Sequence, residues 1–290
     1  MADNKKAIIQ TLLYSSLFNF PLSKDELYYY LHAGSKISEK EFEKYLSLVI
    51  SQIVVKDGFY TLKGNEKSFE LRKKRSITSI KKRDEGLKVA KILGYIPSVL
   101  FIGISGSVAV GNAKDSDDID FFVVTSNRSL YATRLLLLLI LQLLGKRRSR
   151  KEIKPQNKIC LNMLVDQNGM YFQKSSQDLY TARELVQMYP LFERGGYYQK
   201  LLAKNNWTQS LMPHAVGQTN TFIHRKMSIS SIFSVLEPIA KFIEQRLIKR
   251  NQTREVATNH VIALHPNDTK NWVLTKFNNG KLHYSKYYNR

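Results

Sequence analysis

Hydrophobic side chains in the first 65 residues recur at helical spacing and then alternate with polar ones. One side of a first helix would carry four apolar residues: Ile8, Ile9, Leu12 and Leu13. Ser23 and Ser38 are each followed by a glutamate three residues later, which predicts two further helices that begin with a capping box. Asp57-Gly58 separates two β-prone runs and predicts a tight hairpin turn.

Three helices followed by a hairpin resemble a winged helix-turn-helix domain, which we assign to residues 1–65. DNA binding does not follow from this resemblance, because the third helix would enter the major groove and lacks a positive face. It carries three glutamates and two lysines: Glu39, Glu41, Glu43, Lys40 and Lys44. A structural or partner-docking role is an equal alternative.

The middle of the chain alternates predicted helices and strands. A long basic helix is expected over residues 66–93, and a helix capped by Asp178 and ended near Pro190 over residues 178–190. Three apolar runs between them predict buried strands. These runs cover residues 99–105, 119–125 and 158–166.

The run over residues 135–144 is apolar except for Gln142. As a helix it would be about 15 Å long, roughly half the thickness of a bilayer's hydrocarbon core. We therefore expect no transmembrane span and a helix packed beneath a sheet. A helix lying on a membrane surface is the alternative, because basic residues flank the run at both ends.

Together these elements predict an α+β (α/β-like) protein in three parts. The winged-helix-like domain would occupy residues 1–65, and a small mixed-sheet core with its leading basic helix would occupy residues 66–190. Residues 191–290 would form a helical, basic region, in which helical spacing predicts a helix over residues 228–250 that Pro238 kinks.

The chain has 45 Lys and Arg against 24 Asp and Glu, a net charge of +21. Basic segments flank a core whose acids concentrate near residue 118, so a nucleotide or a nucleic acid is the expected partner. A generally basic protein without such a partner is the plainer alternative. The single cysteine, Cys160, excludes an internal disulfide framework and a Cys-based zinc site, and no signal peptide is evident, so we expect a cytoplasmic protein.

The candidate chemistry lies between Gly106 and Asp120, where the chain reads GSVAVGNAKDSDDID. A Gly-Ser turn at a helix N-terminus can bring backbone N–H groups and a hydroxyl against a phosphate. Asp118 and Asp120 lie two residues apart at the start of a strand, so both side chains would point to one face and share divalent cations.

This stretch resembles the signature of the DNA polymerase β nucleotidyltransferase superfamily. The resemblance implies that Asp118 and Asp120 hold Mg²⁺ or Mn²⁺ and that four residues contact the nucleotide. Those four are Gly106, Ser107, Gly111 and Lys114. Two metal ions would position the α-phosphate of a nucleoside triphosphate and stabilise the leaving pyrophosphate.

The sequence departs from the superfamily at the third carboxylate, which usually comes from a later strand. Asn162 stands in the centre of the candidate strand and is a weak ligand, although we include it among the catalytic candidates. Asp166 lies about 13 Å further along that strand, too far to reach the same ion. Val110 also replaces a basic side chain that some relatives carry.

The leading hypothesis is a cytoplasmic, Mg²⁺-dependent enzyme that transfers a nucleoside monophosphate from a nucleoside triphosphate to an unidentified hydroxyl acceptor. The alternative is a catalytically impaired member of this fold that binds nucleic acid or regulates a partner. Aspartates that are splayed apart, that face bulk water or that are buried against an arginine would count against the enzyme.

Overall fold

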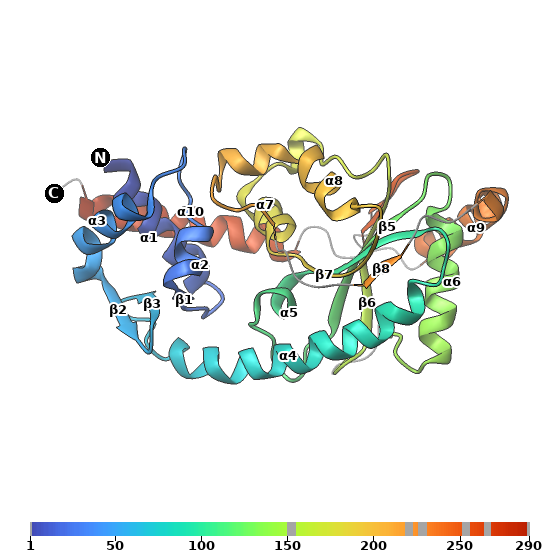
Figure 1. Ribbon diagram of the computed structural model, residues 1–290, viewed down its shortest axis with the longest axis horizontal. Helices are drawn as coiled ribbons and strands as arrows, with labels where there is room; N and C mark the ends of the chain where they lie inside the picture. The colour runs from blue at the N-terminus through green and yellow to red at the C-terminus, as the bar shows by residue number, and fades with distance from the viewer. Residues whose placement is uncertain are drawn as a thin grey trace.

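The computed structural model describes residues 2–149, 155–217, 223–225, 231–250, 256–263 and 268–288. It is an α+β protein with a three-stranded sheet near the N-terminus and a seven-stranded mixed sheet. The fold class predicted from the sequence is confirmed. Figure 1 shows the two sheets toward opposite ends of an elongated molecule, with one long helix running between them.

The N-terminal part contains the three predicted helices, α1 (Ala2–Ser16), α2 (Lys24–Tyr29) and α3 (Glu39–Val49). Both predicted capping boxes are present: the hydroxyls of Ser23 and Ser38 accept hydrogen bonds from the backbone N–H groups of Glu26 and Glu41. The hairpin is β2 (Ile53–Lys56) and β3 (Phe59–Leu62), and β1 (Leu22–Ser23) adds a third strand, giving the order β1-β3-β2. The short 3₁₀ helix η1 (Ile50–Gln52) joins α3 to β2.

The large sheet has the strand order β8-β7-β4-β5-β6-β10-β9. Its central strands are β4 (Val99–Ile104), β5 (Ile119–Thr125) and β6 (Ile159–Asp166), which match the predicted apolar runs to within a residue. β4 pairs antiparallel to β5, and β5 pairs parallel to β6. The remaining strands are β7 (Tyr189–Arg194), β8 (Ile223–Arg225), β9 (Val256–Ala257) and β10 (Val261–Ala263).

Helices cover both faces of this sheet because its strands alternate two sets of apolar side chains. One face packs against α4 (Ser68–Leu93) and α6 (Leu130–Leu143), and α9 (Ser231–Arg250) packs in turn against α6. The other packs against α7 (Leu179–Val186) and α8 (Tyr197–Lys204). The helix predicted over residues 178–190 is shorter in the structure: it ends at Val186, and Pro190 lies in β7.

The apolar run of α6 packs against the sheet through Leu137 and Leu141, both fully buried. Among the described residues, no helix combines the length and the hydropathy needed to cross a bilayer. The C-terminal helix α10 (Asp268–Tyr288) returns to the N-terminal part, where Val273 and Phe277 join the core formed around α1. Both chain termini consequently lie at one end of the molecule (Figure 1).

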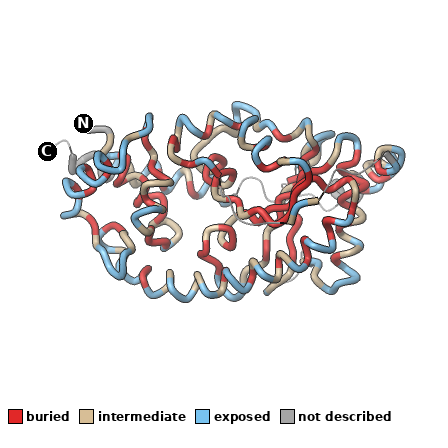
Figure 2. Tube along the Cα trace, viewed as in Figure 1, coloured by how far each residue is buried: buried red, intermediate tan, exposed pale blue. Residues whose placement is uncertain are grey.

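Three short helical turns complete the described chain. α5 (Gly106–Val110) connects β4 to the loop before β5, η2 (Lys174–Ser176) precedes α7, and η3 (Asn206–Ser210) follows α8. Figure 2 shows the buried residues concentrated in the large sheet, in the N-terminal helices and at α5. The turn at α5 is thus a tightly packed element between two strands.

Candidate functional site

The glycine turn begins where β4 ends, at the centre of the large sheet. Gly106 has φ +66°, a backbone conformation that side chains with a β-carbon rarely adopt. A β-carbon at this position would lie 3.5 Å from Oδ2 of Asp120, so Gly106 places the backbone directly against that carboxylate. Gly111 (φ +82°) ends α5, which confines the helix to five residues.

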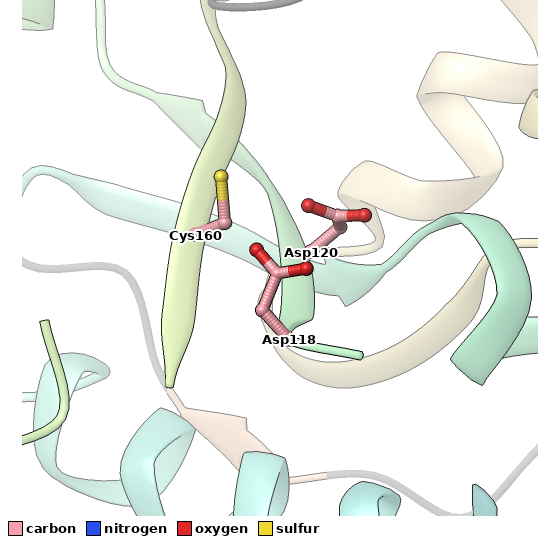
Figure 3. Close-up of side chains that lie close together, drawn as sticks. All are labelled: Asp118, Asp120 and Cys160. Atoms are coloured by element: carbon pink, nitrogen blue, oxygen red, sulfur yellow. The ribbon is translucent and has the colours of Figure 1, made fainter. Parts of the chain in front are cut away.

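Asp118, Asp120 and Cys160 converge where the central strands β5 and β6 begin (Figure 3). One potential ligand atom from each of the three side chains lies within 4.8 Å of the others. Asp120 pairs directly with Cys160 across the parallel strands β5 and β6, which explains why their side chains share a face. The cluster could hold a metal ion.

Cys160 occupies the place that the sequence hypothesis gave to Asn162. Asn162 is half-buried on β6 and lies two residues, about 7 Å, beyond Cys160 along the strand. Asp166 is farther still, and its carboxylate accepts hydrogen bonds from the backbone N–H groups of Asn168 and Gly169. A cysteine in the middle of an apolar run is typical of a core residue, so the sequence alone gave no signal for its position beside Asp120.

Arg148 forms an ion pair with Asp118, with Nη1 lying 2.6 Å from Oδ2. The Asp118 side chain is 14% exposed, so this pair is partly shielded from water. One of the two predicted metal ligands is therefore held by an arginine, which is one of the arrangements that count against the enzyme hypothesis. A cation at Asp118 would have to displace the guanidinium or share the carboxylate with it.

Glu184, on α7, is a carboxylate that the sequence analysis did not single out. Its Oε2 accepts a hydrogen bond from the backbone N–H of Gly106 at 3.2 Å, and its Oε1 accepts one from Nε2 of Gln187 at 3.0 Å. The side chain therefore reaches across from α7 to the first residue of the glycine turn. Its position depends on how α7 packs on the sheet, which local sequence does not encode.

Burial raises the pKa of both Asp120 and Glu184 to about 7. For Asp120, the negative charge of Asp118 raises the pKa further, while Arg148 opposes the shift. For Glu184, the hydrogen bond from Gly106 opposes the effect of burial. Near neutral pH the site therefore holds fewer negative charges than its count of carboxyl groups implies.

The predicted phosphate contacts are occupied by acidic side chains. Ser107 donates its hydroxyl to Oδ2 of Asp117 at 3.0 Å, and the backbone N–H of Lys114 donates to the same oxygen at 2.9 Å. The Lys114 side chain is exposed, so it does not line the metal cluster as a buried cation. Glu184 accepts the hydrogen bond of the Gly106 N–H, so a phosphate would have to displace two carboxylates, those of Asp117 and Glu184.

Two basic residues of α4 hold the loop that carries the aspartates. Lys82 is 2% exposed, and its ammonium group donates to the backbone carbonyls of Asp115 and Asp117 at 3.1 and 2.6 Å. Arg83 donates to the carbonyls of Val108 and Ala109 at the end of α5. The sequence predicts a basic helix over residues 66–93, and Lys82 and Arg83 of that helix fix the glycine turn and the loop after it.

Comparisons of the chain with protein-family models, with curated proteins and with solved structures find no match. The resemblance to polymerase β-type nucleotidyltransferases therefore depends on the motif from Gly106 to Asp120 alone.

Proposed function

We propose that the protein is a cytoplasmic nucleotidyltransferase that uses Mg²⁺ or Mn²⁺ to transfer a nucleoside monophosphate from a nucleoside triphosphate to a hydroxyl acceptor. One observation carries the proposal: the side chains of Asp118 and Asp120 converge at the start of β5, and Asp120 lies directly against Gly106. An arrangement of two carboxylates next to a glycine turn suits a bound cation and the phosphates that it neutralises.

The donor groups fit a divalent cation of this kind. Asp118 and Asp120 supply the carboxylate oxygens that Mg²⁺ and Mn²⁺ prefer. Burial raises the pKa of the Cys160 thiol, so it remains neutral and is a poor ligand for Mg²⁺. When bound, the metal would supply positive charge that offsets the developing charge on the phosphates.

The other residues of the site would bind and orient the substrate. The backbone N–H groups at the start of α5, beginning with Gly106, would hold phosphate oxygens. An entering phosphate would accept the hydrogen bond that the Gly106 N–H now donates to Glu184. The raised pKa of Glu184 favours a neutral carboxyl, which would repel the phosphate less than a carboxylate would. Arg148 would then pair with a phosphate in place of Asp118.

The principal test is pyrophosphate release in the presence of Mg²⁺ or Mn²⁺, measured with each nucleoside triphosphate and a cell lysate as the source of acceptor. Asp118→Ala and Asp120→Ala should each lower the rate by about 100-fold or more, because each removes a metal ligand. Asp84→Ala, which removes an exposed acid on α4, is the matched control and should retain full activity. Absence of activity in the wild type, or equal activity in all variants, would contradict the proposal.

A second candidate is a catalytically impaired member of this fold that binds nucleic acid or regulates a partner. The pairing of Asp118 with Arg148 favours it, because this ion pair satisfies the carboxylate without a metal. Salt-dependent binding to RNA or DNA that survives Asp118→Ala and Asp120→Ala, without any pyrophosphate release, would distinguish this candidate from the enzyme.

A further inference from the structure

Helix α9 exposes a continuous apolar surface at one end of the molecule. It is the outermost helix beyond the large sheet in Figure 1, and Figure 2 shows much of it exposed. Six large hydrophobic side chains on it are between 44% and 73% exposed: Ile232, Val235, Leu236, Ile239, Phe242 and Ile243. Their spacing of three and four residues places them on one side of the helix, where they form what we call the α9 apolar face.

The opposite side of α9 carries the acids. Glu237 accepts hydrogen bonds from the backbone N–H groups of Tyr131 and Ala132, at 3.0 and 2.9 Å, and so caps the start of α6. Glu244 is 1% exposed and forms a buried ion pair with Arg134. A helix facing water normally turns its charged side outward, and α9 does the reverse, so its outer face is suited to an apolar environment.

The charge that the described residues place on the α9 apolar face is positive. Arg246 lies at the end of this face, with its guanidinium 4.1 Å from the centroid of the Phe242 ring. Lys241 lies on the side of the acids, four residues after Glu237, and its ammonium group donates to Oδ1 of Asn259. Both acids of α9 point inward, so this helix offers no exposed carboxylate to pair with the guanidinium of Arg246. The exposed Leu139 and Leu143 of α6 add to the apolar surface of the two helices.

We propose that α9 binds an anionic membrane surface, with its axis parallel to the bilayer and its apolar face among the acyl chains. A second copy of the chain would cover the aliphatic side chains but would bring a second Arg246 and no exposed acid from its own α9. A lipid surface with acidic headgroups supplies both the apolar layer and the negative charge. The stretch from Ile232 to Ile243 would lie along about 17 Å of the interface.

The test is flotation of the full-length protein with vesicles of pure phosphatidylcholine and with vesicles that also contain about 30% phosphatidylglycerol. The test variant is Ile239→Ser/Phe242→Ser. The matched control is Leu48→Ser/Ile50→Ser, which removes two residues of similar exposure (53% and 47%) near the other end of the molecule. Circular dichroism and thermal unfolding establish that both variants fold, as expected for exposed positions.

We expect the wild type and the control to bind the anionic vesicles. The α9 variant should bind them at least about tenfold more weakly. Binding to pure phosphatidylcholine should be weaker for all three proteins because the headgroup charge is absent. Equal binding of the α9 variant and the control would overturn the proposal, because other basic segments would then account for it. Lack of vesicle binding by the wild type would also overturn it. If the wild type is a dimer and the α9 variant is a monomer, a second copy of the chain covers the face and the proposal is overturned.

Discussion

At the scale of single residues, the site brings two carboxyl groups against Gly106. Asp120 approaches the glycine through its side chain, and Glu184 accepts the hydrogen bond of the glycine's backbone N–H. Burial raises the pKa of both groups to about 7, so each is partly protonated at neutral pH in the absence of a cation.

A raised pKa means that the folded state binds a proton that the unfolded state has already lost. The contribution of Glu184 to stability is therefore greatest below its ordinary pKa of 4.5 and is lost as the pH rises toward 7. Glu184→Gln should remove this dependence. The free energy of unfolding of the variant, relative to that of wild type, should therefore rise by about 1–3 kcal/mol as the pH is raised from 5 to 8. Urea unfolding at both pH values measures the change, with Glu70→Gln, an exposed acid on α4, as the control. A constant difference between Glu184→Gln and wild type across the pH range would contradict the prediction.

Part of the site was predictable from the local sequence and part was not. Asp118, Asp120 and Gly106 belong to one local stretch, so their spacing along the chain was enough to predict their proximity. Cys160 reaches the site through the pairing of β5 with β6, and Glu184 reaches it through the packing of α7. Both depend on contacts between distant segments, which no local pattern specifies.

At the scale of elements, α4 fixes the loop that carries the aspartates. Its charged residues follow one another in sequence, yet Lys82 is buried and its neighbour Lys81 is exposed. The ammonium group of Lys82 donates to two backbone carbonyls of the loop and to Oδ1 of Asn157. Composition predicted a basic helix, but only the packing shows which lysine is structural.

Lys82→Met should destabilise the protein by about 2–4 kcal/mol, because the loop carbonyls lose their charged donor in a buried position. Lys81→Met is the matched control, since it makes the same chemical change one residue away at an exposed position, and should change stability by less than about 0.5 kcal/mol. Urea unfolding of the three proteins measures the difference. Equal stability of the two variants would show that Lys82 does not support the loop.

Elements defined by local chemistry were predicted well. The capping boxes at Ser23 and Ser38 and the Asp57-Gly58 turn use only neighbouring residues, and the structure contains all three. The strands β8, β9 and β10 were not predicted, because each has only two or three residues. Such strands are defined by the partner strand beside them rather than by their own periodicity.

At the scale of the whole molecule, distant parts of the chain complete each other's cores. Phe277 of α10 packs against Tyr14 of α1 with ring centroids 5.6 Å apart, and β10 pairs with the second half of β6. The sheet thus supports the aspartates on both sides, with β4 and β6 flanking β5. The start of β5, which positions Asp120, is thus held between two neighbouring strands.

The most direct measurement of the central claim is a titration with Mn²⁺ followed by electron paramagnetic resonance, in which the signal of the free ion decreases as sites fill. Wild type should bind Mn²⁺, and Asp120→Asn, which keeps the shape of the side chain and removes its charge, should weaken binding by about tenfold or more. Asp84→Asn should bind as wild type does. Mn²⁺ binding that is absent in wild type, or that is unchanged by Asp120→Asn, would contradict the claim that this carboxylate cluster is a metal site.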